Sequence, residues 1–192
     1  MRWILTVPAF YLMLACNNQQ KTDADTKTAS ATADSSSAKP QQAEFADAKF
    51  ADIGKALLAQ FENGNIDEWS KVFAGNAVWT WSAGDSLAGK EKIVEYWKKR
   101  RSDLIDSLKF TNDIWLPIKI NTPQRGPDLP GVWLLSWYQA SVKYKQGKKL
   151  TFWVHTDFHF DSTDKIDRVI EYIDRDPLNK AQAAMQIGKS LK

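Results

Sequence analysis

The chain has 192 residues, of which 43% are hydrophobic and 12% aromatic, a composition that fits one globular domain with additional segments. The formal net charge is only +3, so the chain lacks the electrostatic footprint of a nucleic-acid-binding protein and no nucleic-acid partner is expected. The two signs of charge are interspersed except in the run Lys98-Lys99-Arg100-Arg101. This run predicts the solvated face of a helix, and a phosphate or headgroup patch is the alternative.

Residues 1–15 have the pattern of a secretory signal. Arg2 is followed by an apolar run that is too short to span a bilayer and ends at Ala15. The only cysteine, Cys16, stands at the cleavage position, and "LMLAC" resembles the lipobox of bacterial lipoproteins, with Met13 where leucine is commoner. The resemblance implies lipidation at Cys16 and a lipid-anchored protein of the bacterial cell envelope, facing the periplasm or the exterior. An ordinary signal peptide is the alternative.

The segment after this cysteine predicts a tether. Residues 17–42 contain no large apolar side chain, and such a segment cannot bury enough surface to offset the entropy lost on ordering. A flexible coil of this length has a root-mean-square span of about 25–30 Å. We therefore expect residues 16–42 to carry the lipid and to link it to a folded domain, residues 43–180. Residues 181–192 are expected to form a tail or a short helix.

Three helices are predicted in the first half of this domain. Apolar residues recur at helical spacing at Phe50, Ile53, Leu57 and Phe61, and the stretch "ENGN" (62–65) ends this helix with Gly64 as a left-handed cap. The second predicted helix is "IDEWSKVFA" (66–74), which a short strand and turn (75–84) follows. The third is residues 89–108, whose apolar side chains share one side.

The rest of the domain is predicted as strands, at residues 109–120, 132–145, 149–160 and 166–174. A loop rich in proline and glycine (121–131) separates the first two strands, and "KQGK" (145–148) is a hairpin turn between the next two. Helices followed by antiparallel strands indicate an α+β domain with its helices on one face of a curved sheet.

Two stretches of this domain resemble a known superfamily. "ENGNIDEWSKVFAGNAVWTWSAGDSLAGKEKIVEYW" and "DFHFDSTDKIDRVIEYID" are similar to signature stretches of the nuclear transport factor 2-like superfamily, SnoaL-like branch. The resemblance covers roughly residues 45–178. It implies a cone-shaped barrel, in which a curved antiparallel sheet wraps around three N-terminal helices and encloses a pocket. The superfamily includes isomerases, cyclases, hydrolases and members without chemistry, so the fold does not by itself give the function.

The register of the hairpin decides which side chains face this pocket. A turn centred on Gln146-Gly147 pairs Trp133 with Phe160 and Trp137 with Thr156 across the two strands. A three-residue bulged turn is the alternative and would shift this register. That face is the more apolar one and is expected to be concave. The predicted ligand-binding residues are Leu57, Trp79, Trp81, Trp97, Trp133, Trp137, Gln139, Thr156 and Phe158.

The same resemblance argues against one activity of the superfamily. Against a ketosteroid isomerase, Thr156 takes the place of a catalytic aspartic acid, Leu57 that of the catalytic tyrosine and Trp81 that of the general-base aspartate. None of these three residues can perform the corresponding chemistry. The chain is therefore not expected to be a ketosteroid isomerase.

Both histidines of the chain lie in "HTDFHF" (155–160), with Asp157 between them. A strand rises about 3.3 Å per residue, which puts His155 and His159 about 13 Å apart on the face opposite Phe158. Adjacent His and Asp side chains could share an ion, but both histidines could not. Because zinc needs three or four protein ligands and no further His or Cys remains, no metal site is expected.

The opposite face of the sheet is predicted to be a dimer interface. In the same register, Leu134, Tyr138, Val142 and Trp153 form an apolar patch there, which is uncommon on a monomer. Members of the superfamily commonly dimerise through this face, and a homodimer is expected with the histidines in or near the contact.

We expect a module that binds a small apolar or aromatic molecule without catalysis and without a cofactor. The alternative is an isomerase, cyclase or dehydratase that uses Glu171 as an acid or base, and a third possibility is a partner-binding protein with a closed pocket. The family resemblance implies that Val169 and Ile173 face the pocket, so Glu171 is expected to point inward between them, where burial raises its pKa unless a cation or several donors compensate. A salt bridge inside the cone, with a Lys or Arg reaching in from a helix, is the structural alternative to a role in chemistry or ligand binding. A pocket containing a carboxylate would favour the enzyme, and a neutral open pocket would favour binding.

Overall fold

The computed structural model describes residues 41–123, 125, 129–145, 147, 149–181 and 183. The predicted signal peptide, the predicted lipidation site Cys16, the predicted tether up to residue 40 and most of the predicted tail lie outside these residues. No helix in the described ranges is long and apolar enough to cross a membrane.

The three predicted helices are present, as α1 (Lys49–Glu62), α2 (Ile66–Ser70) and α3 (Lys90–Lys99), and a π-helical turn, η1 (Arg100–Leu104), extends the third. Gly64 has a φ of 77° just beyond α1, which confirms the predicted left-handed cap. The second and third helices are shorter than expected. Phe73 already begins a strand, and Ile105 pairs with Tyr144 of another strand, because both side chains are buried in the sheet rather than on a helix.

Seven strands form one sheet in the order β1-β4-β5-β6-β7-β2-β3. Their bounds are β1 (Ala43–Phe45), β2 (Phe73–Trp81), β3 (Ser86–Ala88), β4 (Ile105–Ile120), β5 (Gly131–Tyr144), β6 (Lys149–Phe160) and β7 (Ile166–Tyr172). The sheet is not purely antiparallel as expected, because β2 runs parallel to β7. It is open rather than a closed barrel, since β1 and β3 stand at its two ends.

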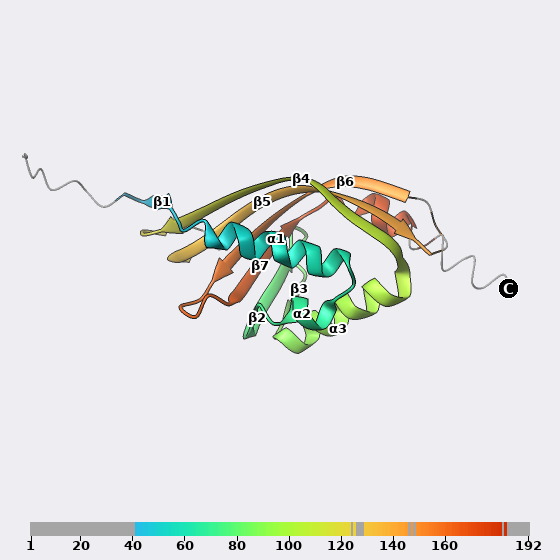
Figure 1. Cartoon of the computed structure of the whole chain (residues 1–192), viewed down its shortest axis with the longest axis horizontal. Coiled ribbons are helices and arrows are strands. Elements are labelled where there is room, and N and C mark those ends of the chain that lie inside the picture. Colours follow the sequence, from blue (N-terminus) through green and yellow to red (C-terminus); the bar gives the residue numbers. More distant parts are fainter. Residues whose placement is uncertain are drawn as a thin grey trace, which may run out of the picture. The chain divides into compact units, whose positions relative to one another are not determined.

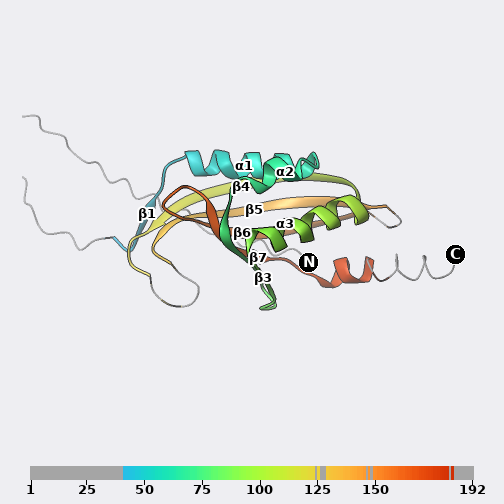
Figure 2. The same ribbon diagram turned by 90° about the horizontal axis from the view of Figure 1, so that it is seen from below.

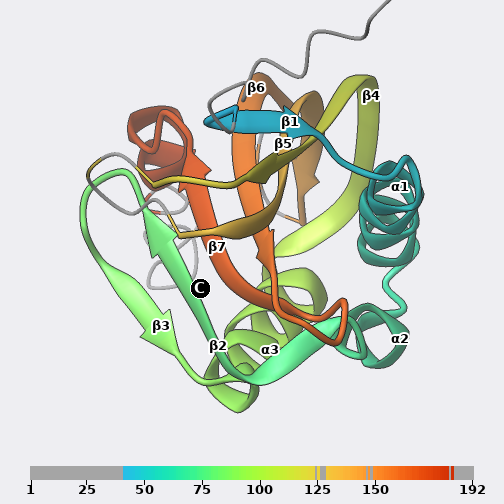
Figure 3. The same ribbon diagram turned by 90° about the vertical axis from the view of Figure 1, so that its left-hand side faces the viewer.

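The helices cover one face of this sheet, here called the inner face. Figure 1 shows α1, α2 and α3 beneath the arch of β4, β5 and β6, and Figure 2 shows from below that α1 runs along β4. Seen along the strands, the sheet bends from β4 and β5 toward β2, with α3 below (Figure 3). Phe50 of α1 packs on Phe160 of β6 with ring centroids 4.7 Å apart. The core therefore fills the concave side of the sheet.

The hairpin of β5 and β6 has a register one residue away from the prediction. Trp133 pairs with His159 and Ser136 with Thr156, and the last pair, Lys143 with Lys149, encloses an odd number of residues. A slip of one residue moves every side chain of a strand to the other face. The predicted faces are therefore correct for β6 and wrong for β5.

This slip corrects the predicted outer patch. Leu134, Tyr138 and Val142 lie on the inner face and are buried. Trp153 alone among the four predicted residues lies on the opposite face, here called the outer face, where 52% of it is exposed.

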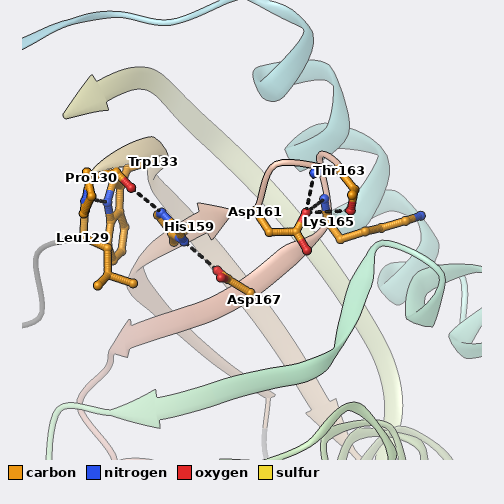
Figure 4. Close-up of polar contacts among 8 residues, drawn as sticks. All are labelled: Leu129, Pro130, Trp133, His159, Asp161, Thr163, Lys165 and Asp167. Atoms are coloured by element: carbon orange, nitrogen blue, oxygen red, sulfur yellow. Dashed lines mark hydrogen bonds and ion pairs between the residues drawn. The ribbon is translucent and has the colours of Figure 1, made fainter. Parts of the chain in front are cut away.

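One end of the outer face is covered by the segment that leads into β5. The Trp133 indole donates to the carbonyl of Leu129 at 2.9 Å, and His159 Nε2 lies 3.2 Å from the carbonyl of Pro130. Figure 4 shows His159 between Pro130 and Asp167, whose carboxylate lies 2.6 Å from Nδ1. Trp133 and His159 are therefore buried although they face away from the helices.

Candidate functional site

A cavity of about 110 Å³ lies between the helices and the inner face of the sheet. The helical side contributes Leu57, Leu58, Phe61, Trp69, Tyr96 and Trp97. The sheet contributes Trp79 and Trp81 from β2, Tyr138, Ala140 and Val142 from β5, and Val154 and Phe158 from β6. An apolar lining with few polar groups is typical of sites that bind small molecules.

Glu171 of β7 is the carboxyl group in this lining, and it is only 6% exposed. Its Oε2 accepts a hydrogen bond from the Trp79 indole at 2.9 Å. Burial raises the pKa of the Glu171 carboxyl to about 7, because loss of hydration outweighs the lowering by the Trp79 hydrogen bond and by the charge of Arg100. The inward orientation expected for Glu171 is confirmed, and its carboxyl can hold or release a proton near neutral pH.

A rim of two arginines and two aromatic rings borders the cavity. The Arg175 guanidinium lies 5.5 Å from the centre of the Trp81 ring, and the Arg100 guanidinium lies 5.9 Å from the centre of the Tyr96 ring. Trp81 and Tyr96 pack together with centroids 5.3 Å apart, which joins the two pairs. Arg175 Nη1 also donates to both oxygens of the Asp85 carboxylate, at 2.6 and 2.7 Å, and this charged contact holds the guanidinium at the rim.

A second polar pair lies on the inner face. The hydroxyl of Tyr138, which lines the cavity, is 3.0 Å from the hydroxyl of Thr156. Burial and the nearby Glu171 raise the pKa of the Tyr138 hydroxyl, so it stays protonated and available as a hydrogen-bond partner. The cavity thus combines aromatic walls with a carboxyl and a phenol group.

The structure brings most of the predicted ligand-binding residues to the cavity. Leu57, Trp79, Trp81, Trp97 and Phe158 line it. Thr156 is fully buried on the same face and reaches Tyr138 through its hydroxyl.

The predicted pocket positions of Trp133, Trp137 and Gln139 are wrong. All three lie on the outer face because the register of β5 is shifted by one residue. Trp137 stacks there on His155 with centroids 4.4 Å apart, and the Gln139 side chain accepts a hydrogen bond from Asn112 at 2.7 Å.

Five tyrosine and arginine residues of the lining were not predicted, namely Tyr96, Arg100, Tyr138, Tyr144 and Arg175. Tyr138 was missed through the register. Arg100 follows Trp97 by three residues and Ile93 by seven, a helical spacing that could have placed it on the same side. The basic run at 98–101 is therefore not simply a solvated face, because Arg100 borders the cavity and Arg101 donates to the carbonyls of Phe61 and Glu62 at the end of α1.

The histidines of "HTDFHF" have separate surroundings on the outer face. His155 lies between the rings of Trp137 and Tyr172, and its Nε2 is 3.0 Å from Asp157 Oδ1. Burial raises the pKa of the Asp157 carboxyl, and the charge of His155 lowers it in part. His159 instead contacts Asp167 and Pro130. In the described part of the chain, no group of three or more potential metal ligands comes together.

Solved structures share this architecture. A putative isomerase from Bacillus subtilis matches with a TM-score of 0.52 at 16% identity, covering 70% of this chain and 93% of that one. An LEH-like epoxide hydrolase from M. tuberculosis matches with a TM-score of 0.51 at 14% identity, covering 73% and 96%. An NTF2-like protein of unknown function from Cytophaga hutchinsonii gives 0.45 at 17% identity, covering 67% and 93%.

Neither a family model nor a curated protein matches the chain. At the identities of the solved structures, the likeness concerns the fold alone. The described domain has the nuclear transport factor 2-like fold, as the resemblance of its sequence implied.

Proposed function

We propose that the domain binds a small apolar or aromatic molecule in the cavity between its helices and the inner face. The observation that carries the proposal is a cavity with aromatic walls around a single buried carboxyl group, Glu171. Such walls supply apolar contact area, and the carboxyl group orients a ligand by hydrogen bonding. Binding requires no group beyond those that line the cavity.

A second candidate function is acid–base chemistry of the isomerase, cyclase or dehydratase kind, with Glu171 as the acid or base. The observation that favours it is the pKa of Glu171, which burial raises to about 7. General acid–base catalysis is most effective when the catalytic pKa lies near the working pH. Of the two outcomes weighed from the sequence, a pocket that contains a carboxylate is the one that favours the enzyme, so Glu171 supports this candidate. Binding of a ligand in the cavity is the step that both candidates share.

Mass spectrometry of small molecules that stay with the purified protein tests the binding proposal. The chain with Cys16→Ser, which cannot be acylated at this position, is suitable because it avoids detergent. We expect an apolar or aromatic molecule in the parent and at least a tenfold loss in Ala140→Leu, since Ala140 lines the cavity and a larger side chain occupies its space.

Gln139→Leu is the matched control, because Gln139 is the neighbouring residue of β5 and lies on the outer face. It should leave retention unchanged. A parent protein that retains no small molecule and binds none of a panel of single-ring aromatics would contradict the proposal.

We also propose that Cys16 anchors the protein to a membrane of the bacterial cell envelope. The support is the apolar run ending at Ala15 immediately before the only cysteine. Cys16→Ser should move the protein from the membrane fraction to the soluble fraction and remove the mass of the lipid. A variant that stays membrane-bound with the mass of the lipidated form would refute the anchor.

A further inference from the structure

Two arginines belong to the lining of a cavity whose walls are otherwise mainly apolar. Arg100 and Arg175 are partly exposed, whereas most of the other lining side chains are buried, so the two guanidinium groups lie where the cavity meets solvent. Burial raises the pKa of the Glu171 carboxyl, and the charges of both arginines lower it in part. The positive charge at the rim is therefore felt inside the cavity.

The guanidinium of Arg175 has donors that the described residues do not use. Nη1 donates to both oxygens of the Asp85 carboxylate, at 2.6 and 2.7 Å. A guanidinium carries five N–H donors in one plane, and the three on Nε and Nη2 make no hydrogen bond within the described part of the chain. Asp85 lies outside the lining and Arg175 belongs to it, so Nη1 is turned toward a residue outside the cavity. The edge formed by Nε and Nη2 is the one left for a ligand.

This free edge lies beside an apolar wall. The Arg175 guanidinium is 5.5 Å from the centre of the Trp81 ring, and Trp81 is a buried part of the lining. The Arg175 side chain is 36% exposed, so water satisfies its free donors in the empty protein. A carboxylate exchanges this water for two parallel, charge-assisted hydrogen bonds to the planar edge, and such bonds are stronger beside a wall that excludes water.

We propose that the ligand is an amphiphilic carboxylate, whose apolar body occupies the cavity and whose carboxylate accepts hydrogen bonds from Nε and Nη2 of Arg175. This inference rests on the proposed function and specifies its ligand class. The aromatic walls favour the apolar body because its surface is removed from water. Arg100 adds positive potential at the same rim, since its charge also reaches Glu171.

Calorimetric titration of the Cys16→Ser chain with phenylacetate and phenylacetamide tests the proposal, because the two probes have nearly the same shape and differ in charge. At pH 6 the acid probe is ionised, since carboxyl groups in water have pKa values of about 4, whereas the pKa of about 7 keeps Glu171 mostly protonated. Phenylacetate should bind at least tenfold more tightly than phenylacetamide. Acetate, which has the charged group without the ring, should bind at least tenfold more weakly than phenylacetate.

Arg175→Gln should abolish the preference for the carboxylate while changing the affinity for phenylacetamide by no more than about twofold. The double variant Asp85→Asn with Arg175→Gln should behave in the same way, which separates loss of the donors from repulsion by an unpaired Asp85. Lys180→Gln is the matched control, because it removes a positive charge from a side chain that is 76% exposed and outside the lining. It should keep the preference.

A measurement on the protein with Arg175 intact guards against a folding defect in these variants. In a ¹H–¹⁵N spectrum, the Nε proton of Arg175 should shift downfield with phenylacetate and not with phenylacetamide. Phenylacetamide binding as tight as phenylacetate binding, or a preference that persists without Arg175, would overturn the carboxylate assignment while leaving cavity binding intact. Acetate binding as tight as phenylacetate binding would also overturn it, because the ring would then contribute nothing. Absence of binding by both ring-bearing probes would overturn this inference and, together with a parent protein that retains no small molecule, the proposed function.

Discussion

Glu171 loses its hydration in the folded protein, and the stability of the domain should therefore depend on pH. Its pKa is about 7 in the fold against an ordinary value of 4.5. Between these values the folded protein holds a proton that the unfolded chain has released. The free energy of unfolding should consequently fall as pH rises through this window, by roughly 3 kcal/mol in total, and stay lower above it.

Glu171→Gln removes the ionisation and keeps the shape of the side chain. The variant should melt several degrees above the parent at pH 8 and at a similar temperature at pH 4.5, measured by circular dichroism. Glu91→Gln, at an exposed position in the first turn of α3, is the control and should keep the profile of the parent. If the melting temperature of Glu171→Gln differs between pH 4.5 and pH 8 by as much as that of the parent, the Glu171 carboxyl is not the source of the pH dependence.

At the scale of single elements, Gly54 fixes how closely α1 approaches the sheet. A Cβ atom there would lie 2.5 Å from Trp115 Cζ3 and 2.6 Å from Leu134 Cδ2. Glycine inside a helix costs up to about 1 kcal/mol relative to alanine, whereas overpacking a core costs about 1–3 kcal/mol. Gly54→Ala should therefore lower the free energy of unfolding by about 1–2 kcal/mol.

Urea unfolding of Gly54→Ala beside Gly75→Ala checks this balance. A Cβ atom at Gly75 of β2 meets no atom within 4 Å, so that substitution should be neutral or slightly stabilising. Greater stability in Gly54→Ala than in the parent would mean that α1 moves away from Trp115 at little cost.

The elements also show which parts of the fold the sequence could predict. The spacing of Phe50, Leu57 and Phe61 predicts a helix with an apolar stripe on one side, and in α1 all three side chains are buried. The strands β1 and β3 have three residues each, too few for a periodic signal. The parallel pairing of β2 with β7 joins distant segments, so neither segment encodes it alone.

The residues of the candidate site likewise divide into those that a local pattern predicts and those that depend on pairing between strands. Glu171 could be predicted because alternation within one strand, β7, puts it on the same face as Val169 and Ile173, and the family resemblance implied which face is inward. The faces of Tyr138 and Trp137 depended on the number of residues in the hairpin turn, which local patterns do not specify. Because the turn differs by one residue from the predicted one, Tyr138 lines the cavity and Trp137 does not.

At the scale of the whole molecule, the outer face still carries exposed apolar side chains after the correction of the register. Ile114, Trp153 and Tyr172 are 56%, 52% and 43% exposed and lie on three different strands. Their pairing partners on β5 and β6, Trp137 and His155, are half-buried on the same face. An apolar surface that spans several strands is uncommon on a monomer.

We propose that a second copy of the chain covers this outer face, and light scattering of the Cys16→Ser chain tests it. The parent should have the mass of a dimer, and Trp153→Glu should be monomeric, because a dimer would bury the new charge. Ala59→Glu is the control, since Ala59 is exposed on α1, and it should remain dimeric. A monomeric parent would reject dimerisation. A dimer that tolerates Trp153→Glu would place the interface away from the outer face, and the exposed Ile114, Trp153 and Tyr172 would then need another explanation.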